Sequence, residues 1–186
     1  MSRWRAVVPL NLGRPCKTRL AGALSADERE RLVAAMARHV VATLIDAVGE
    51  VAVLSPERPP FVGTAWLADR GCGLNAELAG AMAQPRTVVV HADLPLLSGE
   101  DVRLLLDAAE AHGAALAPDR FGRGTNALAR LAGSPFTPAF GDGSLALHRA
   151  MLPAAGIVAR HGLGLDVDTP QDLVLARAAG WIAGPI

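Results

Sequence analysis

The chain has 186 residues, 51% of them hydrophobic and 19% charged, so it is long enough and apolar enough to bury a core. Its 18 basic and 18 acidic residues cancel, so charge gives no reason to expect nucleic acid or a membrane surface as a partner. Cys16 and Cys72 are isolated, and no stretch has the apolar length of a signal peptide or a membrane span, so we expect a cytoplasmic protein.

Short apolar runs alternate with segments of helical periodicity along the chain. The run Thr87-Val-Val-Val is the clearest strand, because an uninterrupted apolar stretch is typical of strands buried on both faces of a parallel sheet. We expect strands at residues 5–10, 51–55, 64–69, 87–93, 114–117, 127–131, 156–160 and 163–168, and helices at residues 26–49, 76–83, 99–112, 145–151 and 172–179. Asn75 is expected to cap the second helix. This alternation predicts one α/β domain, residues 1–186, with a mostly parallel sheet covered on both faces.

Asp166 and Asp168 are two residues apart on backbone expected to be extended, so both side chains should point to one face. Two carboxylates held that close repel each other, and a divalent metal between them is the usual answer at neutral pH. The next residues, Thr169-Pro170-Gln-Asp172, have the pattern of a helix start. The acids therefore lie at a strand-to-helix junction, where open α/β sheets bind ligands. The alternative is that they serve only the turn and the cap.

Other residues suited to ligand binding are expected at the same edge of the sheet. Asp93 follows the clearest strand, and Lys17 and Arg19 lie in the first strand-to-helix loop, where α/β folds hold phosphates. Carboxylates and basic side chains on facing loops suit a metal-bound triphosphate. The alternatives are a turn acid at the end of a strand and a solvated basic loop.

Two turns, residues 124–126 and 140–144, supply hydroxyls and backbone amides that suit a small phosphate or carboxylate anion. Alternatively, their glycines only form turns and Ser144 only caps a helix. His91 and His148 are expected to pack or to support other residues, and the histidines lack the spacing of a zinc site.

Together these stretches resemble the CofC/FbiD family, guanylyltransferases that make the phosphodiester precursor of the deazaflavin coenzyme F-420. The resemblance covers nearly the whole chain. Its motifs are Val7-Val8-Pro9, Lys17-Thr18-Arg19-Leu20, Gly73-Leu74-Asn75, Ala92-Asp93-Leu94-Pro95, Ala117-Pro118-Asp119-Arg120, Gly124-Thr125-Asn126-Ala127-Leu128, Phe140-Gly141-x-x-Ser144 with His148, and Leu165-Asp166-Val167-Asp168-Thr169-Pro170-x-Asp172-Leu173. One departure is Asn11, where the family commonly has Lys and where Arg14 could substitute.

The resemblance implies a three-layer, Rossmann-like α/β/α sandwich of the nucleotide-diphospho-sugar transferase (GT-A-like) type. It also implies that a phosphate oxygen of phosphoenolpyruvate or 2-phospho-L-lactate attacks the α-phosphorus of GTP and releases pyrophosphate. By motif position, the Mg²⁺ ligands would be Asp93, Asp166 and Asp168, and the phospho-acid would bind Thr125, Gly141 and Ser144. The nucleotide would contact Pro9, Lys17, Arg19, Gly73 and Asn75, with Lys17, Arg19 and Asp93 as the catalytic residues. A homodimer is left open.

Several readings compete with this one. Phosphoenolpyruvate is favoured over 2-phospho-L-lactate and 3-phosphoglycerate, because the Ala- and Arg-rich composition suggests a high-GC bacterium and bacterial members of the family mainly use phosphoenolpyruvate. A nucleotidyltransferase for molybdopterin or a sugar phosphate is the first alternative, although the first loop lacks the Gly-Gly-rich pattern of those families. The second is a non-catalytic nucleotide-binding module, against which the three acids Asp93, Asp166 and Asp168 argue.

Overall fold

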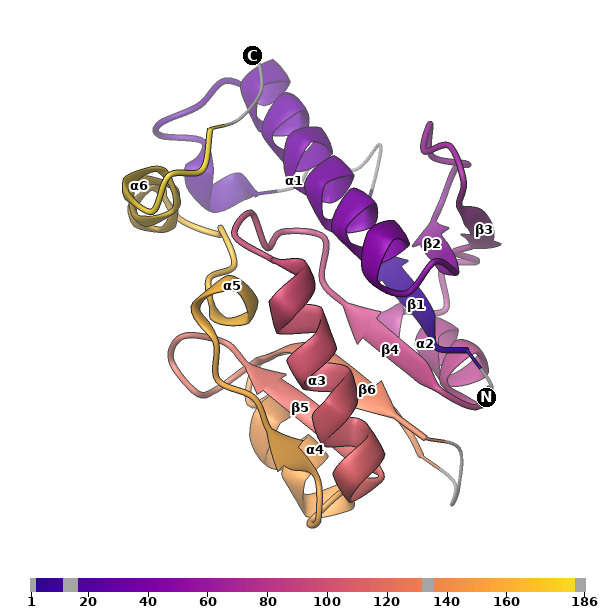
Figure 1. The fold of residues 1–186 in the computed structure, drawn as a ribbon. Coiled ribbons are helices and arrows are strands. Elements are labelled where there is room, and N and C mark those ends of the chain that lie inside the picture. The colour runs from indigo at the N-terminus through magenta and orange to yellow at the C-terminus, as the bar shows by residue number, and fades with distance from the viewer. Residues whose placement is uncertain (1–2, 12–16, 132–135, 183–186) are drawn as a thin grey trace.

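The computed structural model describes residues 3–11, 17–131 and 136–182. The elements in chain order are β1 (Arg5–Pro9), the 3-10 helix η1 (Thr18–Leu20), α1 (Ala26–Ala47), β2 (Val51–Ser55), β3 (Ala65–Ala68), α2 (Leu74–Met82), β4 (Thr87–Val90), α3 (Gly99–His112), β5 (Ala114–Pro118), β6 (Thr125–Arg130), α4 (Ser144–Met151), β7 (Gly156–Ile157), α5 (His161–Gly164) and α6 (Pro170–Ala178). In the described part of the chain the strands form one seven-stranded sheet in the order β3-β2-β1-β4-β6-β5-β7 (Figure 1). β6 pairs antiparallel with β4 and β5, and the other pairings are parallel.

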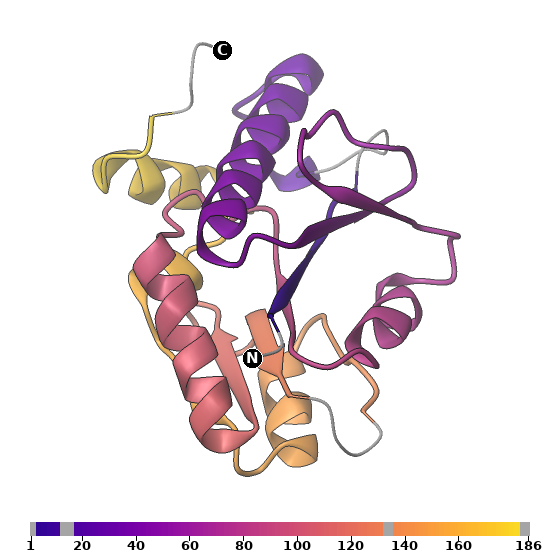
Figure 2. The same ribbon diagram turned by 45° about the vertical axis from the view of Figure 1, so that its right-hand side comes forward.

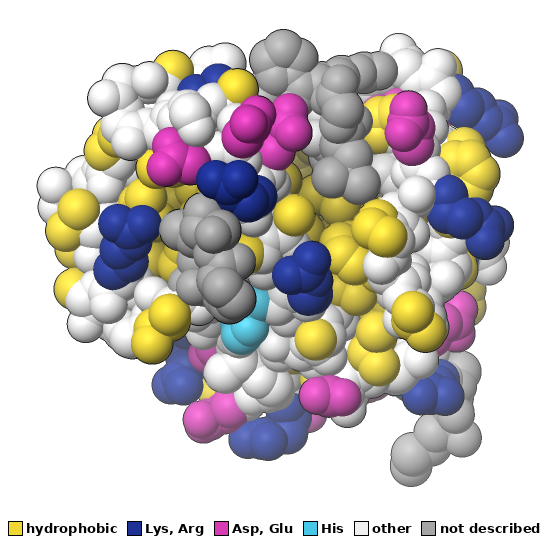
Figure 3. All heavy atoms as spheres, turned by 90° about the horizontal axis from the view of Figure 1, so that it is seen from above, with side chains coloured by type: hydrophobic (Ala, Val, Ile, Leu, Met, Phe, Trp, Pro, Cys, Tyr) yellow, Lys and Arg dark blue, Asp and Glu magenta, His cyan; other side chains and the backbone are white. Residues whose placement is uncertain are grey.

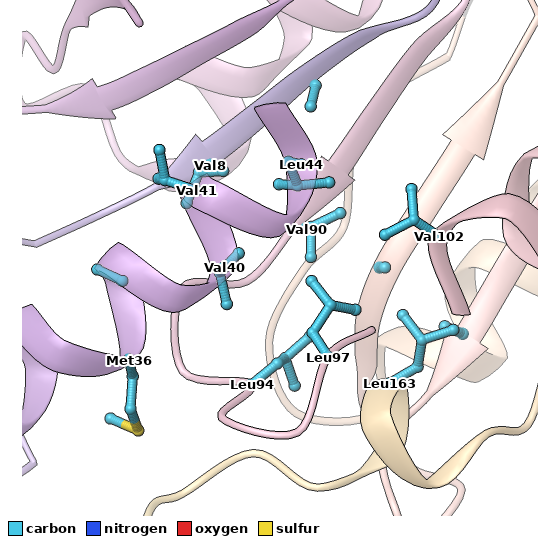
Figure 4. Packing of buried hydrophobic residues seen from close by; sticks show 14 of the residues in the cluster. Val8, Met36, Val40, Val41, Leu44, Val90, Leu94, Leu97, Val102 and Leu163 are labelled. Carbon is cyan, nitrogen blue, oxygen red and sulfur yellow. The ribbon is translucent and has the colours of Figure 1, made fainter. Parts of the chain in front are cut away.

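Helices cover both faces of this sheet, with α1 and α3 on one face and α2 and α4 on the other (Figures 1 and 2). The alternation of side chains along β1 builds both layers, because Val8 packs into the cluster that contains α1, whereas Val7 packs with Leu78 of α2. Figure 4 shows the first of these layers, with Val40 and Leu44 of α1 beside strand residues Val8 and Val90. Within the described ranges, no helix is long and apolar enough to cross a bilayer.

The predicted α/β architecture is confirmed, and so are the starts of the helices expected at residues 26 and 99 and of the helix after Thr169. Capping boxes open α1 at Ser25, α3 at Ser98 and α6 at Thr169. Each box satisfies backbone amides that the first turn of a helix leaves without partners. These starts were predictable because each signal lies within four consecutive residues.

Two predictions of local structure are wrong. Asn75 does not cap α2, because its side-chain amide is bonded to the backbone of Phe140, and Gly73 at φ 92° takes the cap position instead. The stretch 163–168 is not a strand of the sheet. α5 takes up its first residues, and Asn126 Nδ2 donates to the carbonyls of Leu163 and Gly164, 3.0 and 3.3 Å away. In addition, the strand expected at 156–160 is limited to Gly156–Ile157.

Candidate active site

An ion-pair cluster of Lys17, Asp93 and Asp168 lies at the edge of the sheet where the parallel strands end. Lys17 Nζ is 2.5 Å from Asp93 Oδ2 and 2.6 Å from Asp168 Oδ1. Lys17 precedes η1 in the left-handed conformation, with φ 51°, and its side chain is only 11% exposed. One ammonium group therefore bridges two acids that are 75 residues apart in the chain, so three of the predicted site residues meet at one point.

Backbone pairing places the second acid beside the first. The amide of Val167 donates to the carbonyl of Asp93 over 3.1 Å, so the segment that carries Asp166 and Asp168 runs along the end of β4. Leu165 and Val167 are buried, and the two acids alternate with them. The predicted period of two therefore holds, although the segment is not part of the sheet.

Asp93, Lys17 and Asp166 have different electrostatic environments. Burial works to raise the pKa of Asp93, but the ammonium of Lys17 outweighs it and holds that pKa below its usual value. Burial likewise works to lower the pKa of Lys17, yet Asp93 and then Asp168 raise it well above its usual value. For Asp166, burial and then the charge of Asp93 raise the pKa, while a 3.2 Å hydrogen bond from Asn126 Nδ2 opposes this.

The cap of α6 is made by side chains other than those of Asp166 and Asp168. Asp172 Oδ2 accepts from the amides of Asp168 and Thr169, and Thr169 Oγ1 accepts from the amide of Asp172. Arg120 forms an ion pair with the other oxygen of Asp172. The carboxylates of Asp166 and Asp168 take no part in this cap, so the capping part of the alternative, in which they serve only the turn and the cap, is wrong.

The donor chemistry of the acids fits a hard divalent cation. Asp93 Oδ1 is buried and has no hydrogen-bond partner among the described residues. Carboxylate oxygens are the ligands that Mg²⁺ prefers. However, no three His, Cys, Asp or Glu side chains of the described residues are grouped closely enough to hold a metal ion, since the ammonium of Lys17 lies between Asp93 and Asp168. Assignment of Asp93, Asp166 and Asp168 as metal ligands therefore stays a prediction.

A cleft of about 530 Å³ extends from this cluster across the ends of the parallel strands. Figure 3 shows this face, on which acidic and basic side chains surround a hollow with hydrophobic atoms in its floor. Of the predicted nucleotide-binding residues, Pro9, Lys17 and Gly73 line the cleft. Asn11 also lines it, and Arg14, its possible substitute, lies outside the described residues.

The other two residues predicted to contact the nucleotide lie differently. Arg19 is 74% exposed, and its guanidinium is 3.8 Å from Asp168 Oδ2. Asn75 donates to the carbonyl of Phe140 and accepts from its amide, over 3.0 and 2.7 Å, so it ties α2 to the segment before α4. Neither residue is among those that line the cleft.

The predicted phospho-acid residues come together on the other side of β4. Ser144 Oγ accepts from the amide of Thr125 over 2.9 Å, and the amide of Ser144 donates to the carbonyl of Gly141. Ser144 is not the cap of α4, since Gly143 holds that position. Because β6 runs antiparallel to β4, its first residue Thr125 lies at the edge where Asp93 follows β4.

His148 orients this hydroxyl cluster, which we define as Thr125, Ser144 and His148. The amide of Ala139 donates to His148 Nε2 over 3.0 Å, so Nδ1 carries the proton and donates to Thr125 Oγ1, also 3.0 Å away. Burial, and then the charge of His91, lower the pKa of His148 to about 4. The imidazole is therefore neutral at pH 7, and its two hydrogen bonds agree with the expectation that His148 supports other residues.

Three contributors to this edge were not among the predicted site residues. Asp69 follows β3 and lines the far end of the cleft. His91 also lines it, and its Nε2 is buried with no hydrogen-bond partner in the described part of the chain. Asn126 fixes Asp166 and the end of α5. His91 was expected to pack or to support other residues, and Asn126 lies in the turn already singled out at residues 124–126, whereas Asp69 carried no signal in the sequence.

Comparison with known proteins relates this chain to one enzyme family. The family model described as "Guanylyl transferase CofC like" matches residues 4–176. A phosphoenolpyruvate guanylyltransferase of Sphaerobacter thermophilus is 37% identical over 185 residues, covering 90% of this chain and 89% of that protein. One of Chloroflexus aggregans is 36% identical over 187 residues, covering 89% and 93%. A solved structure from Desulfovibrio desulfuricans, provisionally assigned as a nucleotide-diphospho-sugar transferase, has a TM-score of 0.68 at 19% identity and covers 97% of this chain and 89% of its own, so the fold is of that type.

Proposed function

The chain belongs to the CofC family of guanylyl transferases, and from this we propose that it transfers the guanylyl group of GTP to the phosphate of phosphoenolpyruvate. Pyrophosphate is the second product, and the reaction serves the biosynthesis of coenzyme F-420. Residues 1–186 act as a single nucleotidyltransferase domain in the cytoplasm. Phosphoenolpyruvate is preferred to 2-phospho-L-lactate because both relatives described above carry its name.

One observation carries the proposal: the ion-pair cluster lies at one end of the cleft, with the hydroxyl cluster beyond it. On one side the cleft crosses the ends of the parallel strands, and on the other lie Thr125 and Ser144. A nucleotidyl transfer needs this arrangement, because two anionic substrates must meet at one charged centre.

The chain's own residues can perform the transfer without a general base. A phosphate oxygen of the acceptor is already an anion at neutral pH, so it forms the new bond to the α-phosphorus without losing a proton. The bond from the α-phosphorus to the bridging oxygen breaks, and pyrophosphate leaves with that oxygen. Lys17, and Arg19 from the exposed rim, offset the negative charge of the triphosphate and of the leaving group.

The groups proposed to hold the acceptor are oriented by hydrogen bonds within the protein and still have donors left for a ligand. Within the described residues, the hydroxyls of Thr125 and Ser144 act as acceptors in the bonds above, so each still has a proton to donate. Both residues are buried, so a phosphate or carboxylate oxygen reaches these hydroxyls only if the exposed turn at Gly141 shifts. Gly141 is exposed and can offer its backbone amide. Mg²⁺ held by Asp93, Asp166 and Asp168 would supply further neutralisation of phosphate charge.

The test is pyrophosphate release from GTP with Mg²⁺ and, in turn, phosphoenolpyruvate, 2-phospho-L-lactate and 3-phosphoglycerate. We expect the fastest release with phosphoenolpyruvate. Faster pyrophosphate release with another acid would identify that acid, instead of phosphoenolpyruvate, as the acceptor substrate. Release with molybdopterin or a sugar phosphate alone would favour the neighbouring transferases, and binding of GTP without release on any acceptor would favour a non-catalytic module.

A further inference from the structure

The far end of the cleft, away from the ion-pair cluster, has a floor made by consecutive parallel strands. The sheet order β3-β2-β1-β4 puts Asp69, which follows β3, three strand spacings from Asp93, which follows β4. At about 4.8 Å per spacing these residues are roughly 14 Å apart. A ligand that fills the cleft is therefore elongated, with one end at Lys17 and the other at Asp69.

The backbone of Asp69 is held by a hydrogen bond, while one of its two carboxylate oxygens has no hydrogen-bond partner among the described residues. Its amide donates to the carbonyl of Ser55 over 2.9 Å, which extends the pairing of β2 and β3 by one residue. Its Oδ1 accepts from the amide of Gly71 over 2.8 Å. Its Oδ2 has no partner among the residues that the structure describes, and the side chain is half-buried in the wall of the cleft.

A second acid, Glu77, stiffens the loop that carries Asp69. Glu77 Oε1 accepts from the amides of Arg70 and Cys72, over 2.8 and 3.2 Å, so the turn between β3 and α2 is braced from within. Apolar side chains of Leu10, Leu54 and Leu74 line the same cleft. The far end therefore offers apolar walls for a flat ring and two carboxylates, of which Glu77 is engaged by the loop amides and Asp69 keeps one oxygen for a ligand.

We propose that the carboxylate of Asp69 binds the base of the nucleotide by hydrogen bonds and selects guanine. Guanine presents two adjacent donors, N1–H and the 2-amino group. A carboxylate can accept a hydrogen bond from each of them. Adenine and cytosine present a ring nitrogen with a lone pair at the corresponding position, which a carboxylate repels. This inference rests on the proposed function, because it takes the triphosphate to lie at Lys17.

Equilibrium binding of GTP, ITP and ATP with Mg²⁺ and without acceptor tests the inference. ITP lacks the 2-amino group, so the wild-type protein should bind it about tenfold more weakly than GTP, and ATP more weakly still. Asp69→Asn keeps an oxygen for Gly71 but puts a donor where Oδ2 was. GTP affinity should then fall about 10- to 100-fold, while ATP affinity holds or rises, because adenine N1 can accept from the new amide.

Asp107→Asn is the matched control, since Asp107 is exposed on α3 and does not line the cleft. It makes the same change of charge and should leave the ratio of GTP to ATP affinity unaltered. A wild-type protein that binds the three nucleotides equally overturns the inference without any variant, and so does an Asp69→Asn protein with the wild-type ratio. Pyrophosphate release by the wild-type protein separates the two proposals: release with an unchanged ratio in Asp69→Asn refutes only the role of Asp69.

Discussion

Replacing Lys17 by Met should destabilise the fold, because Met fills a similar volume but leaves Asp93 and Asp168 facing each other without a cation. Each of these carboxylates lies within 2.6 Å of the ammonium in the wild-type protein. At an effective dielectric constant of about 20, each attraction is worth about 6 kcal/mol before the cost of burying the charges is subtracted. Removing one partner from a buried pair typically costs 3–5 kcal/mol. Since Asp168 is 45% exposed, we expect the lower end, about 3 kcal/mol.

The measurement is the free energy of unfolding by urea at pH 7, with a chelator present. Arg19→Met is the matched control, because Arg19 is 74% exposed and 3.8 Å from the same Asp168, so its loss should cost less than about 0.5 kcal/mol. Adding Mg²⁺ should recover more stability in the Lys17→Met protein than in the wild type, since a divalent cation can then neutralise the unpaired acids.

The pH dependence of the free energy of unfolding gives a second check on the role of Lys17. The pKa of Lys17 is raised, so its contribution is complete below the unfolded value of 10.5 and is lost only above it. The pKa of Asp93 is lowered, so its contribution is complete above the unfolded value of 3.8 and is lost as the pH falls further. Without the ammonium, burial raises the pKa of Asp93, so protonation relieves the unpaired charge in the variant as the pH falls. The difference between wild type and Lys17→Met should therefore be largest from about pH 7 to 10 and shrink at lower pH. A difference below about 0.5 kcal/mol in that range would refute the bridging role of Lys17.

Four further outcomes are expected. Asp168→Asn should abolish pyrophosphate release while circular dichroism shows the fold retained, and normal turnover would remove Asp168 from the site. Ser144→Ala should raise the acceptor KM roughly tenfold and the GTP KM little, and an equal rise in both would contradict an acceptor role. Because burial depresses the pKa of His148 from 6.5 to about 4, the unfolded chain binds more protons between these values. The free energy of unfolding should therefore fall by up to about 3 kcal/mol as the pH drops through this window, and His148→Gln should remove that slope. Asn75→Ala should cost about 2 kcal/mol in urea unfolding through its two bonds to Phe140, and a neutral result would show that these bonds are dispensable.

Local signals explain which parts of the fold could be predicted from the sequence. The buried run of β4 and the capping boxes at Ser25, Ser98 and Thr169 depend on residues close together in the chain. The cap assigned to Asn75 failed because a distant backbone, that of Phe140, competes for the same side chain. The strand expected at 163–168 failed for a similar reason, since Asn126 binds the carbonyls that a strand would have used.

The site was predictable as a set of residues but not as a geometry. The rule that ligands bind at the carboxyl ends of parallel strands places Asp93 and the loop of Lys17 at one edge. It does not place the ammonium between Asp93 and Asp168, because that depends on the left-handed backbone at Lys17. Asp69 escaped notice because its position in the cleft follows from the order β3-β2-β1-β4, which periodicity cannot supply.

Strand β6, the one reversed strand in the sheet of the described residues, explains how the two halves of the site come together. In a sheet with every strand parallel, the first residues of β6 would lie at the opposite edge from Asp93. Because β6 is antiparallel to β4, Thr125 joins the hydroxyl cluster and the next residue, Asn126, holds Asp166 at the same edge. Consecutive side chains of a strand point to opposite faces, so these two residues serve two different regions from one strand. The single antiparallel strand is therefore what sets the predicted acceptor region beside the predicted metal ligands.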